Sequence, residues 1–328
     1  MRPSTRGRLA AAVLAGLLVL PGCAAPRDAA PSPVGEGAVP PRCGPDGSYT
    51  IGMSQANLAE SFYRRQDEDV RAAAAEVPQL TVRFADAVED NSRQVAQIEE
   101  FLRQPVDLLI VSPNEPTPLT GIVKKAFDQG VPVIVLGRDV KRDDYTALVA
   151  PDDIAIGREA GHFLAGALPD GGPVAELRGL PGSAAARDRA AGLAEALAGT
   201  STRLVAARDA DWLRDEARRM TAEILGEHPD LRGLFAHNVE MAEGAHQAAV
   251  AAGRADLPIV AVTGLTGESD GVAAVAEGRF AALVYHSTGG REAVETSRRL
   301  LVDCQPVPKR QPLPLRLVTP ANVTDFIR

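Results

Sequence analysis

Hydrogen-bonding side chains follow the short apolar runs of this sequence again and again. The segments that do so are 54–57, 112–115, 137–139, 180–183 with Arg187 and Arg189 close behind, 209–212, 237–238, 263–264 and 285–286. Aromatic residues make up only 4% of the chain, yet the single Trp and the residues Phe62, Tyr63 and Tyr285 fall at or near the same points. Flat apolar rings beside polar edges predict a slot for a small polyhydroxylated ligand.

Other kinds of chemistry lack their residue patterns. Ser183 follows a Gly, but the Gly-x-Ser-x-Gly spacing of a nucleophile elbow is absent. Neither a phosphate-binding loop nor a dinucleotide-binding Gly pattern occurs in the sequence. His162, His228, His237 and His246 show no metal-ligand spacing. We therefore expect a binding protein that is not an enzyme and that has no metal and no cofactor.

The elements that must position these side chains alternate between strands and helices. In the first half the pattern predicts strands near 49–54, 80–85, 106–111 and 131–136, and helices at 61–76, 92–104 and 119–129. The second half repeats the plan, with strands near 173–177, 203–207, 231–236, 259–262 and 281–285, and helices at 185–198, 215–227, 239–252 and 271–277. Short β-branched runs between amphipathic helices predict an α/β fold with two doubly wound parallel-sheet lobes. In such sheets ligands bind outside the carboxyl ends of the strands, where the polar segments lie.

Length and charge limit the class of partner. The chain has 328 residues with 43 Asp and Glu against 35 Lys and Arg, a net charge of −8. Nucleic-acid binding depends on concentrated Lys and Arg, so we expect no nucleic-acid partner.

The N-terminus has the organisation of an export signal. Three Arg in the first eight residues precede the apolar run 9–20, which is shorter than the roughly 20 residues needed to span a bilayer. The ending Leu20-Pro21-Gly22-Cys23 resembles the bacterial lipobox, in which cleavage before the Cys leaves a thiol that carries lipid, with palmitate among its acyl chains. We predict a signal peptide at 1–22, a lipid on Cys23 and an extended flexible tether over 23–48, rich in Ala, Pro and Gly. The alternative is a Cys that follows an ordinary secretory signal by chance.

Several segments, in order, carry a family resemblance. They are the segments 51–60, 107–115, 182–192, 238–242, 288–293 and 317–320. From Tyr49 to the end the chain resembles the ribose and galactose type of periplasmic-binding-protein-like domain, the substrate-binding subunits of ABC sugar importers. The resemblance implies two lobes joined by a multi-strand hinge, made of 49–151 with 287–314 and of 152–286 with 315–328.

The resemblance also implies a set of ligand contacts. They are Ser54, Asn57, Phe62, Tyr63, Arg138, Arg189, Trp212, Asn238, Thr263 and His286. Arginine presents a rigid fork of donors that bonds adjacent hydroxyls in pairs. Asparagine offers a donor and an acceptor, and Trp212 with an aromatic ring of the other lobe can hold the faces of a sugar ring.

Two positions depart from the family pattern. Gly137 and Thr263 stand where the family usually has Asp. Asp139, Glu60 or Glu115 are candidates to replace the missing carboxylates, so Glu60 joins the predicted site. Other interpretations remain open for single residues: Ser54 and Asn238 as helix caps, Trp212 as core, and Arg187 in place of Arg189.

Function follows from the resemblance in two versions. The first is an extracytoplasmic lipoprotein, monomeric and anchored to the outer face of the cell membrane, that delivers a monosaccharide or polyol to an ABC permease and its ATPase. The second is a lipoprotein that reports the ligand to a membrane receptor without transport. A secreted enzyme lacks a nucleophile with an evident base, and a repressor of this fold needs a DNA-binding segment where the signal peptide lies.

The two remaining cysteines predict a disulfide between Cys43 and Cys304. Cys43 lies six residues before the first strand, at the end of the lobe that is far from the ligand. A helix of about 16 residues from Thr288 spans roughly 24 Å, about the depth of a lobe, and brings Cys304 to the same end. An exported compartment permits oxidation, and two unrelated thiols are the alternative.

Overall fold

The computed structural model describes residues 36–37, 40, 42–104, 106–263 and 271–327. Within these residues the strands form two six-stranded sheets and one two-stranded ribbon. The predicted signal peptide and Cys23 lie outside the described residues. Among the described residues, no helix has the length and the apolar character needed to cross a membrane.

The first sheet, of the N-terminal lobe, has the order β13-β6-β5-β4-β2-β3, with all neighbours parallel. Its strands are β2 (Tyr49–Gln55), β3 (Leu80–Asp86), β4 (Leu108–Val111), β5 (Val133–Leu136), β6 (Ala147–Ala150) and β13 (Arg310–Pro312). Its helices are α1 (Ser61–Ala75), α2 (Asn91–Arg103), α3 (Pro116–Asp128) and α9 (Gly290–Leu301). Met53 packs with residues of α1 and α9 on one face, and Leu109 packs with residues of α2 and α3 on the other. Both faces of the sheet are therefore covered, which accounts for its nearly continuous apolar strands.

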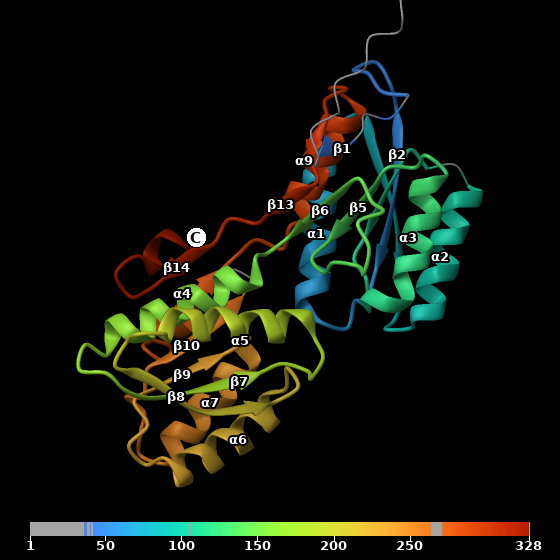
Figure 1. Cartoon of the computed structure of the whole chain (residues 1–328). Coiled ribbons are helices and arrows are strands. Elements are labelled where there is room, and N and C mark those ends of the chain that lie inside the picture. Colours follow the sequence, from blue (N-terminus) through green and yellow to red (C-terminus); the bar gives the residue numbers. More distant parts are fainter. Residues whose placement is uncertain (1–35, 38–39, 41, 105, 264–270, 328) are drawn as a thin grey trace, which may run out of the picture. The chain divides into compact units, whose positions relative to one another are not determined.

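The second sheet, of the C-terminal lobe, has the order β14-β11-β10-β9-β7-β8. Its strands are β7 (Gly172–Arg178), β8 (Thr202–Asp209), β9 (Gly233–Ala236), β10 (Ile259–Thr263), β11 (Ala282–Tyr285) and β14 (Arg316–Val318), the last antiparallel to β11. Helices α4 (Asp153–Ala167) and α5 (Ala184–Leu197) cover one face, and α6 (Arg214–Glu227) and α7 (Val239–Ala251) cover the other (Figure 1). The short helices α8 (Val272–Ala276) and η1 (Val323–Asp325) complete this lobe.

The chain passes between the two sheets three times. It does so between β6 and α4, between β11 and α9, and between β13 and β14. The α/β class with two doubly wound parallel-sheet lobes is confirmed, but the sequence analysis missed β6, α4, β13 and β14. The predicted helix from Thr288 is wrong in length, since α9 begins at Gly290 and has 12 residues. Gly289 ends the preceding segment with a φ of 81°, a left-handed conformation that suits glycine.

The last part of the predicted tether is attached to the N-terminal lobe. Strand β1 (Glu36–Gly37) pairs antiparallel with β12 (Val307–Pro308), and the Gly44 amide donates to the Leu301 carbonyl at 2.8 Å. Cys43 and Cys304 form a disulfide with their Cα atoms 5.5 Å apart, the pair that the sequence predicts. The described residues of this segment are thus joined to the lobe by main-chain pairing and by a covalent bond.

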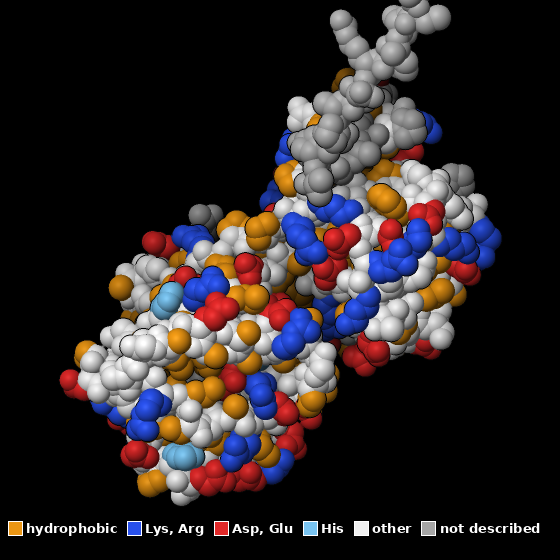
Figure 2. All heavy atoms as spheres, in the orientation of Figure 1, with side chains coloured by type: hydrophobic (Ala, Val, Ile, Leu, Met, Phe, Trp, Pro, Cys, Tyr) orange, Lys and Arg blue, Asp and Glu red, His pale blue; other side chains and the backbone are white. Residues whose placement is uncertain are grey.

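Charges of both signs are interspersed over the face shown in Figure 2. Several charged side chains of the described residues form exposed ion pairs, such as Lys124 with Asp128 and Arg158 with Glu195. Exposed pairs of this kind contribute little to stability, about 0–1 kcal/mol each. The fold therefore rests mainly on the apolar cores on either side of each sheet.

Candidate functional site

In the N-terminal lobe, Tyr63 and Arg138 meet at the carboxyl ends of the strands. Tyr63, in the first turn of α1, is only 7% exposed, and Arg138 follows β5 with its guanidinium carbon 5.9 Å from the Tyr63 ring. Arg138 also donates to the Asn114 carbonyl, in the segment after β4. Burial raises the pKa of the Tyr63 hydroxyl, and Arg138 opposes that shift. The pair therefore offers a neutral phenol beside a fixed cation.

Asn57 and Glu60 form a compact turn in front of α1. The Asn57 side chain accepts from the Glu60 amide at 3.1 Å and donates to the Glu60 carboxylate at 3.2 Å. Asn57 is buried, whereas Glu60 is exposed. The half-buried Phe62 packs edge-on against Tyr63, with the ring centres 5.5 Å apart. Glu60 is thus the carboxylate of this turn that solvent reaches.

Ser54 occupies a different place from its predicted neighbours. It lies inside β2, is fully buried, and alternates with Met53 and Gln55, so its side chain points to the face covered by α2. Its hydroxyl has no hydrogen-bond partner in the described part of the chain. The alternative interpretation of Ser54 as a helix cap is wrong, because helix α1 begins at Ser61.

Gln55 anchors a buried polar cluster that the sequence analysis missed. Its amide donates to Gln66 at 3.1 Å and to Asp67 at 2.9 Å, and Gln66 donates to the Thr288 carbonyl at 2.7 Å. Burial raises the pKa of Asp67 to about 6. A Gln at the end of an apolar run and two polar residues one turn into the next helix were the available signals.

Arg189 is the central cation of the C-terminal lobe. Its Nε donates to Asp153 at 2.8 Å, it also donates to the His237 carbonyl, and its side chain is only 10% exposed. Arg187, two residues earlier on α5, pairs with Asp188 and is 67% exposed. Arg189 therefore faces the ends of the strands, held by Asp153 at the start of α4 and by the main chain after β9.

Trp212 lies beside Arg189, whose guanidinium carbon is 5.8 Å from the indole ring. The ring packs directly over Gly179, because a Cβ at that position would lie 2.0 Å from Cζ2 of the indole. Asn238 caps α7 by accepting from the Met241 amide at 2.8 Å, and it donates to the Trp212 carbonyl at 3.2 Å. The cap interpretation of Asn238 is thus correct, and the same side chain fixes the Trp212 loop.

A buried pair that was not predicted lies beneath this group. His237 and Glu176 are almost wholly buried, with Nε2 of the imidazole 3.0 Å from the carboxylate. Burial lowers the pKa of His237, so the neutral imidazole is favoured. A charged residue within strand β7 was the only sequence signal for this pair.

Thr263 ends β10, and His286 directly follows the neighbouring strand β11. Both are more than nine-tenths buried, and the His286 amide donates to the Thr263 carbonyl at 3.0 Å. The His286 ring nitrogen Nδ1 lies 2.8 Å from the Ser287 carbonyl, so it carries the proton. Burial lowers the pKa of His286 to about 4. The imidazole is therefore neutral at physiological pH.

Comparisons with known proteins agree on one family. The family model described as a periplasmic binding protein domain matches residues 51–302. The chain belongs to the periplasmic binding proteins. The ribose import binding protein of Bacillus subtilis is 31% identical over 284 residues, which cover 86% of this chain and 91% of that protein.

Solved structures agree with this family. The fructose-binding periplasmic domain of a hybrid two-component system has a TM-score of 0.77 at 31% identity, covering 84% of this chain and 92% of its own. A solute-binding protein of Bacillus halodurans with bound myo-inositol has a TM-score of 0.76 at 28% identity, covering 85% and 97%. These relatives are solute-binding proteins and not enzymes.

In this periplasmic binding protein, Gly137 and the three carboxylates that are candidates to replace the missing Asp residues have different surroundings. Gly137 has a φ of 79°, and a Cβ there would lie 3.7 Å from the Gln66 amide nitrogen. Asp139 accepts from its neighbour's amide and pairs with Arg310, so its carboxylate is already engaged. Glu115 precedes α3 and is exposed. Of the three candidate substitutes, Glu60 is the one that lies beside Tyr63.

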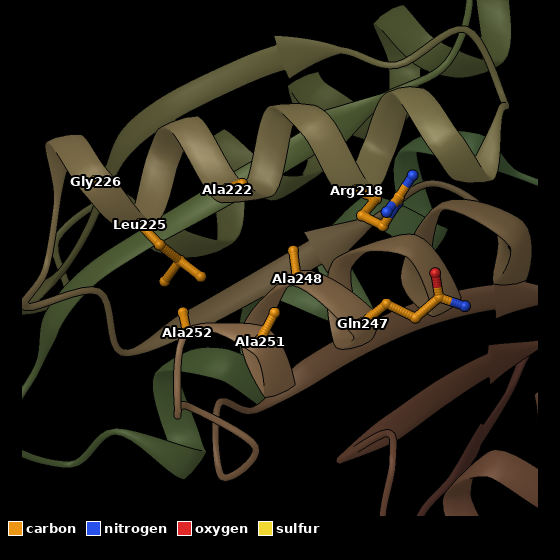
Figure 3. A pocket seen from close by; sticks show the side chains of 8 residues that line it. All are labelled: Arg218, Ala222, Leu225, Gly226, Gln247, Ala248, Ala251 and Ala252. Carbon is orange, nitrogen blue, oxygen red and sulfur yellow. The ribbon is translucent and has the colours of Figure 1, made fainter.

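Two hollows of the C-terminal lobe are lined by few of the candidate site residues described above. A groove of about 600 Å³ runs between α6 and α7, with Leu225 facing Ala248, Ala251 and Ala252, and with Arg218 at its rim (Figure 3). It holds none of the predicted contacts. A second hollow of about 340 Å³ surrounds the loop after β7, from Gly179 to Ser183. This loop lies under Trp212 and belongs to the carboxyl edge of the sheet.

Proposed function

We propose that this periplasmic binding protein captures a monosaccharide or sugar-like polyol between its two lobes and delivers it to an ABC permease and its ATPase. The observation that carries the proposal is the Arg189, Trp212 and Asn238 group, in which a rigid donor fork stands beside an aromatic ring. Tyr63 and Arg138 offer the same pairing of ring and guanidinium in the other lobe. The names of relatives that bind ribose, fructose and myo-inositol support the ligand class.

Closure follows from contacts on both lobes. A ligand that touches the two carboxyl edges together stabilises the state in which the lobes approach each other. The division into 49–151 with 287–314 and 152–286 with 315–328 is part of this proposal. Its support is the three passages of the chain between the sheets, which fall at or next to those boundaries.

A thermal-shift panel tests the ligand class. D-ribose, D-fructose, xylitol and myo-inositol are added to the mature protein, and the midpoint of unfolding is measured. A ligand at 100 times its dissociation constant adds about 2.7 kcal/mol of stability. We expect at least one member to raise the midpoint by several degrees. A panel without any shift contradicts the proposal.

The proposed anchor is a lipid on Cys23, with the protein on the outer face of the cell membrane as a monomer. The apolar run before Cys23 is too short to span a bilayer, so retention at the membrane requires the lipid. Cys23→Ser is expected to move the protein from the membrane fraction to the medium or periplasm. Retention of that variant in the membrane fraction would contradict the anchor.

A sensing role is the second candidate. The likeness to a binding domain of a hybrid two-component system favours it. Deletion of the gene distinguishes the two roles, because loss of uptake of the radiolabelled ligand indicates transport. Normal uptake with a lost transcriptional response to the ligand indicates sensing.

A further inference from the structure

Two connections, one in each lobe, repeat the same design. Strands β3 and β8 are the outer strands of their sheets, each paired on one side only, with β2 and β7 respectively. Each is followed by four residues and then a helix: 87–90 before α2, and 210–213 before α6. Both connections lie at the carboxyl edge, where ligands of parallel sheets bind.

The two connections share an unusual backbone. Val88 and Glu89 have φ values of 51° and 61°, and Asp211 and Trp212 have 53° and 68°. Among the described residues, the non-glycine residues with a positive φ are these four and Cys304. Such a conformation is costly for residues with a Cβ, above all for a β-branched Val, and it persists where the surroundings impose it.

The same hydrogen bonds impose it in both lobes. The Ala87 amide donates to the neighbouring strand at the Gln55 carbonyl, and the Ala210 amide donates to the Arg178 carbonyl. The Asp90 amide donates to the Ala87 carbonyl at 3.0 Å. In the same way, the Leu213 amide donates to the Ala210 carbonyl at 2.8 Å. Both Ala side chains are fully buried. The two loops are therefore structural equivalents, and Glu89 stands where the other lobe has Trp212.

The surroundings of Glu89 point toward a ligand. The side-chain amide of Asn114 donates to the Glu89 main-chain carbonyl at 3.0 Å. The main-chain carbonyl of Asn114 accepts from Arg138. The loop that contains Glu89 therefore contacts the same segment as Arg138. The Glu89 charge acts on the Tyr63 phenol. Tyr63 is more than nine-tenths buried. Glu89 itself is exposed.

We propose that Glu89 is a ligand contact, the counterpart in the N-terminal lobe of Trp212 in the C-terminal lobe. Its carboxylate accepts hydrogen bonds from ligand hydroxyls that lie between it and the Tyr63 hydroxyl. It supplies the carboxylate that Gly137 and Thr263 do not provide. The inference rests on the proposed function, since it deepens the description of the same site.

The charges around Glu89 define the class of ligand. The charges of Glu60, Glu89 and Arg138 all act on Tyr63, while Arg189 in the other lobe is already paired with Asp153. Two carboxylates beside one cation repel an anionic ligand. The site therefore takes a neutral polyol or sugar, or an amino derivative of one, and rejects sugar acids and sugar phosphates.

Three variants test the contact. Glu89→Gln removes the charge and keeps the shape, and Glu89→Asn removes the charge in a residue that tolerates the left-handed backbone. Glu68→Gln is the matched control, an exposed acid on α1. Calorimetry uses the tightest neutral binder among D-ribose, D-fructose, xylitol and myo-inositol. Both Glu89 variants are expected to bind at least tenfold more weakly, with Glu68→Gln equal to the parent and with little change in the unfolding midpoints.

A charged probe completes the test. D-galacturonate is expected to bind the parent at least 100-fold more weakly than the best neutral probe, and Glu89→Gln is expected to narrow that gap. Equal affinities of the parent and both Glu89 variants overturn the contact, as does a parent that prefers D-galacturonate. A parent that binds no member of the panel refutes the proposed function itself, and the Glu89 contact with it.

Discussion

Arg189 and Arg138, the proposed ligand-binding arginines of the two lobes, are fixed to different degrees. Arg189 has a carboxylate and a main-chain carbonyl as partners and is nearly buried. Arg138 has one main-chain carbonyl and the face of Tyr63. Pre-organised donors contribute more affinity because binding does not have to order them. From this difference we predict that the C-terminal lobe contributes more of the binding free energy than the N-terminal lobe.

The largest expected effect comes from Arg189→Ala. We expect the loss of about 3–5 kcal/mol of binding free energy, because ligand hydroxyls lose a charged donor in a buried setting. Stability falls too, by about 1–3 kcal/mol, since Asp153 and the His237 carbonyl lose their partner. Calorimetry measures the first effect and urea titration the second.

Arg187→Ala is the control for this prediction, because Arg187 lies on the same helix with an exposed partner. It is expected to leave affinity and stability nearly unchanged. Equal affinity of Arg189→Ala and the parent would remove Arg189 from the site.

The second largest effect comes from the disulfide, which lies in one lobe only. It joins residues 261 positions apart, and both lie with the N-terminal lobe. Cys304→Ser is expected to lower the unfolding free energy by about 2–5 kcal/mol, as the loss of a native disulfide does in small exported domains. Ligand affinity should stay at the parental value, because the bond lies away from the carboxyl edges. An affinity that falls with stability would contradict this separation.

Two buried groups with opposite pH dependence give the third effect. His286 has a lowered pKa of about 4, so it contributes stability above pH 6.5 that is lost as the pH falls through 4. Asp67 has a raised pKa of about 6, so it contributes stability below pH 4 that is lost as the pH rises through 6. Each contribution is about 3 kcal/mol at 1.36 kcal/mol per pH unit, and in the parent the two nearly cancel.

Single variants reveal each group. Asp67→Asn removes the group that opposes His286. The free energy of unfolding should therefore rise more steeply with pH between 4 and 6.5 than it does in the parent. His286→Gln removes one group that opposes Asp67, so the free energy of unfolding should rise less, or fall more, with pH over the same interval than it does in the parent. Urea titrations at pH 4, 5, 6 and 7 measure both slopes. Variants whose profiles run parallel to that of the parent would show that neither group titrates as described.

The smallest effect tests how Trp212 is placed. A methyl group at Gly179 collides with the indole, so Gly179→Ala should displace Trp212 and weaken ligand binding about 5- to 30-fold, or about 1–2 kcal/mol. Gly166→Ala is the control, because nothing lies within 4 Å of a Cβ at that position. Unchanged binding by Gly179→Ala would mean that the ring does not contact the ligand.

Much of the fold could be predicted, because an apolar strand buried on both faces has an unambiguous pattern. Strand β4 and helix α2 are examples, with bounds within two residues of the expected ones. Helix α4 was missed, since its glycines at 157 and 161 pack against α5 and do not follow an amphipathic pattern. The length of α9 was misjudged, and the pairing of β1 with β12 was missed because it joins segments distant in sequence.

The positions of the candidate site residues could be predicted from the sequence, but their hydrogen-bond partners could not. The carboxyl-edge rule locates Arg138, Trp212 and Asn238 from the sequence alone. It does not show that Asn57 turns back onto Glu60, or that the loops at 87–90 and 210–213 share one strained backbone. Those features depend on contacts between segments distant in sequence, which periodicity does not record.

Trp212 allows the most direct test of the central claim, because it is the single tryptophan of the chain. Its emission is recorded while D-ribose, D-fructose, xylitol and myo-inositol are titrated separately into the mature protein. We predict that at least one of them changes the emission along a saturable curve with one site per chain, and that Arg189→Ala shifts the midpoint to much higher concentration while Arg187→Ala does not. Emission that stays constant with all four ligands, or a curve that is the same in Arg189→Ala, would contradict a sugar site at the carboxyl edges of the two sheets.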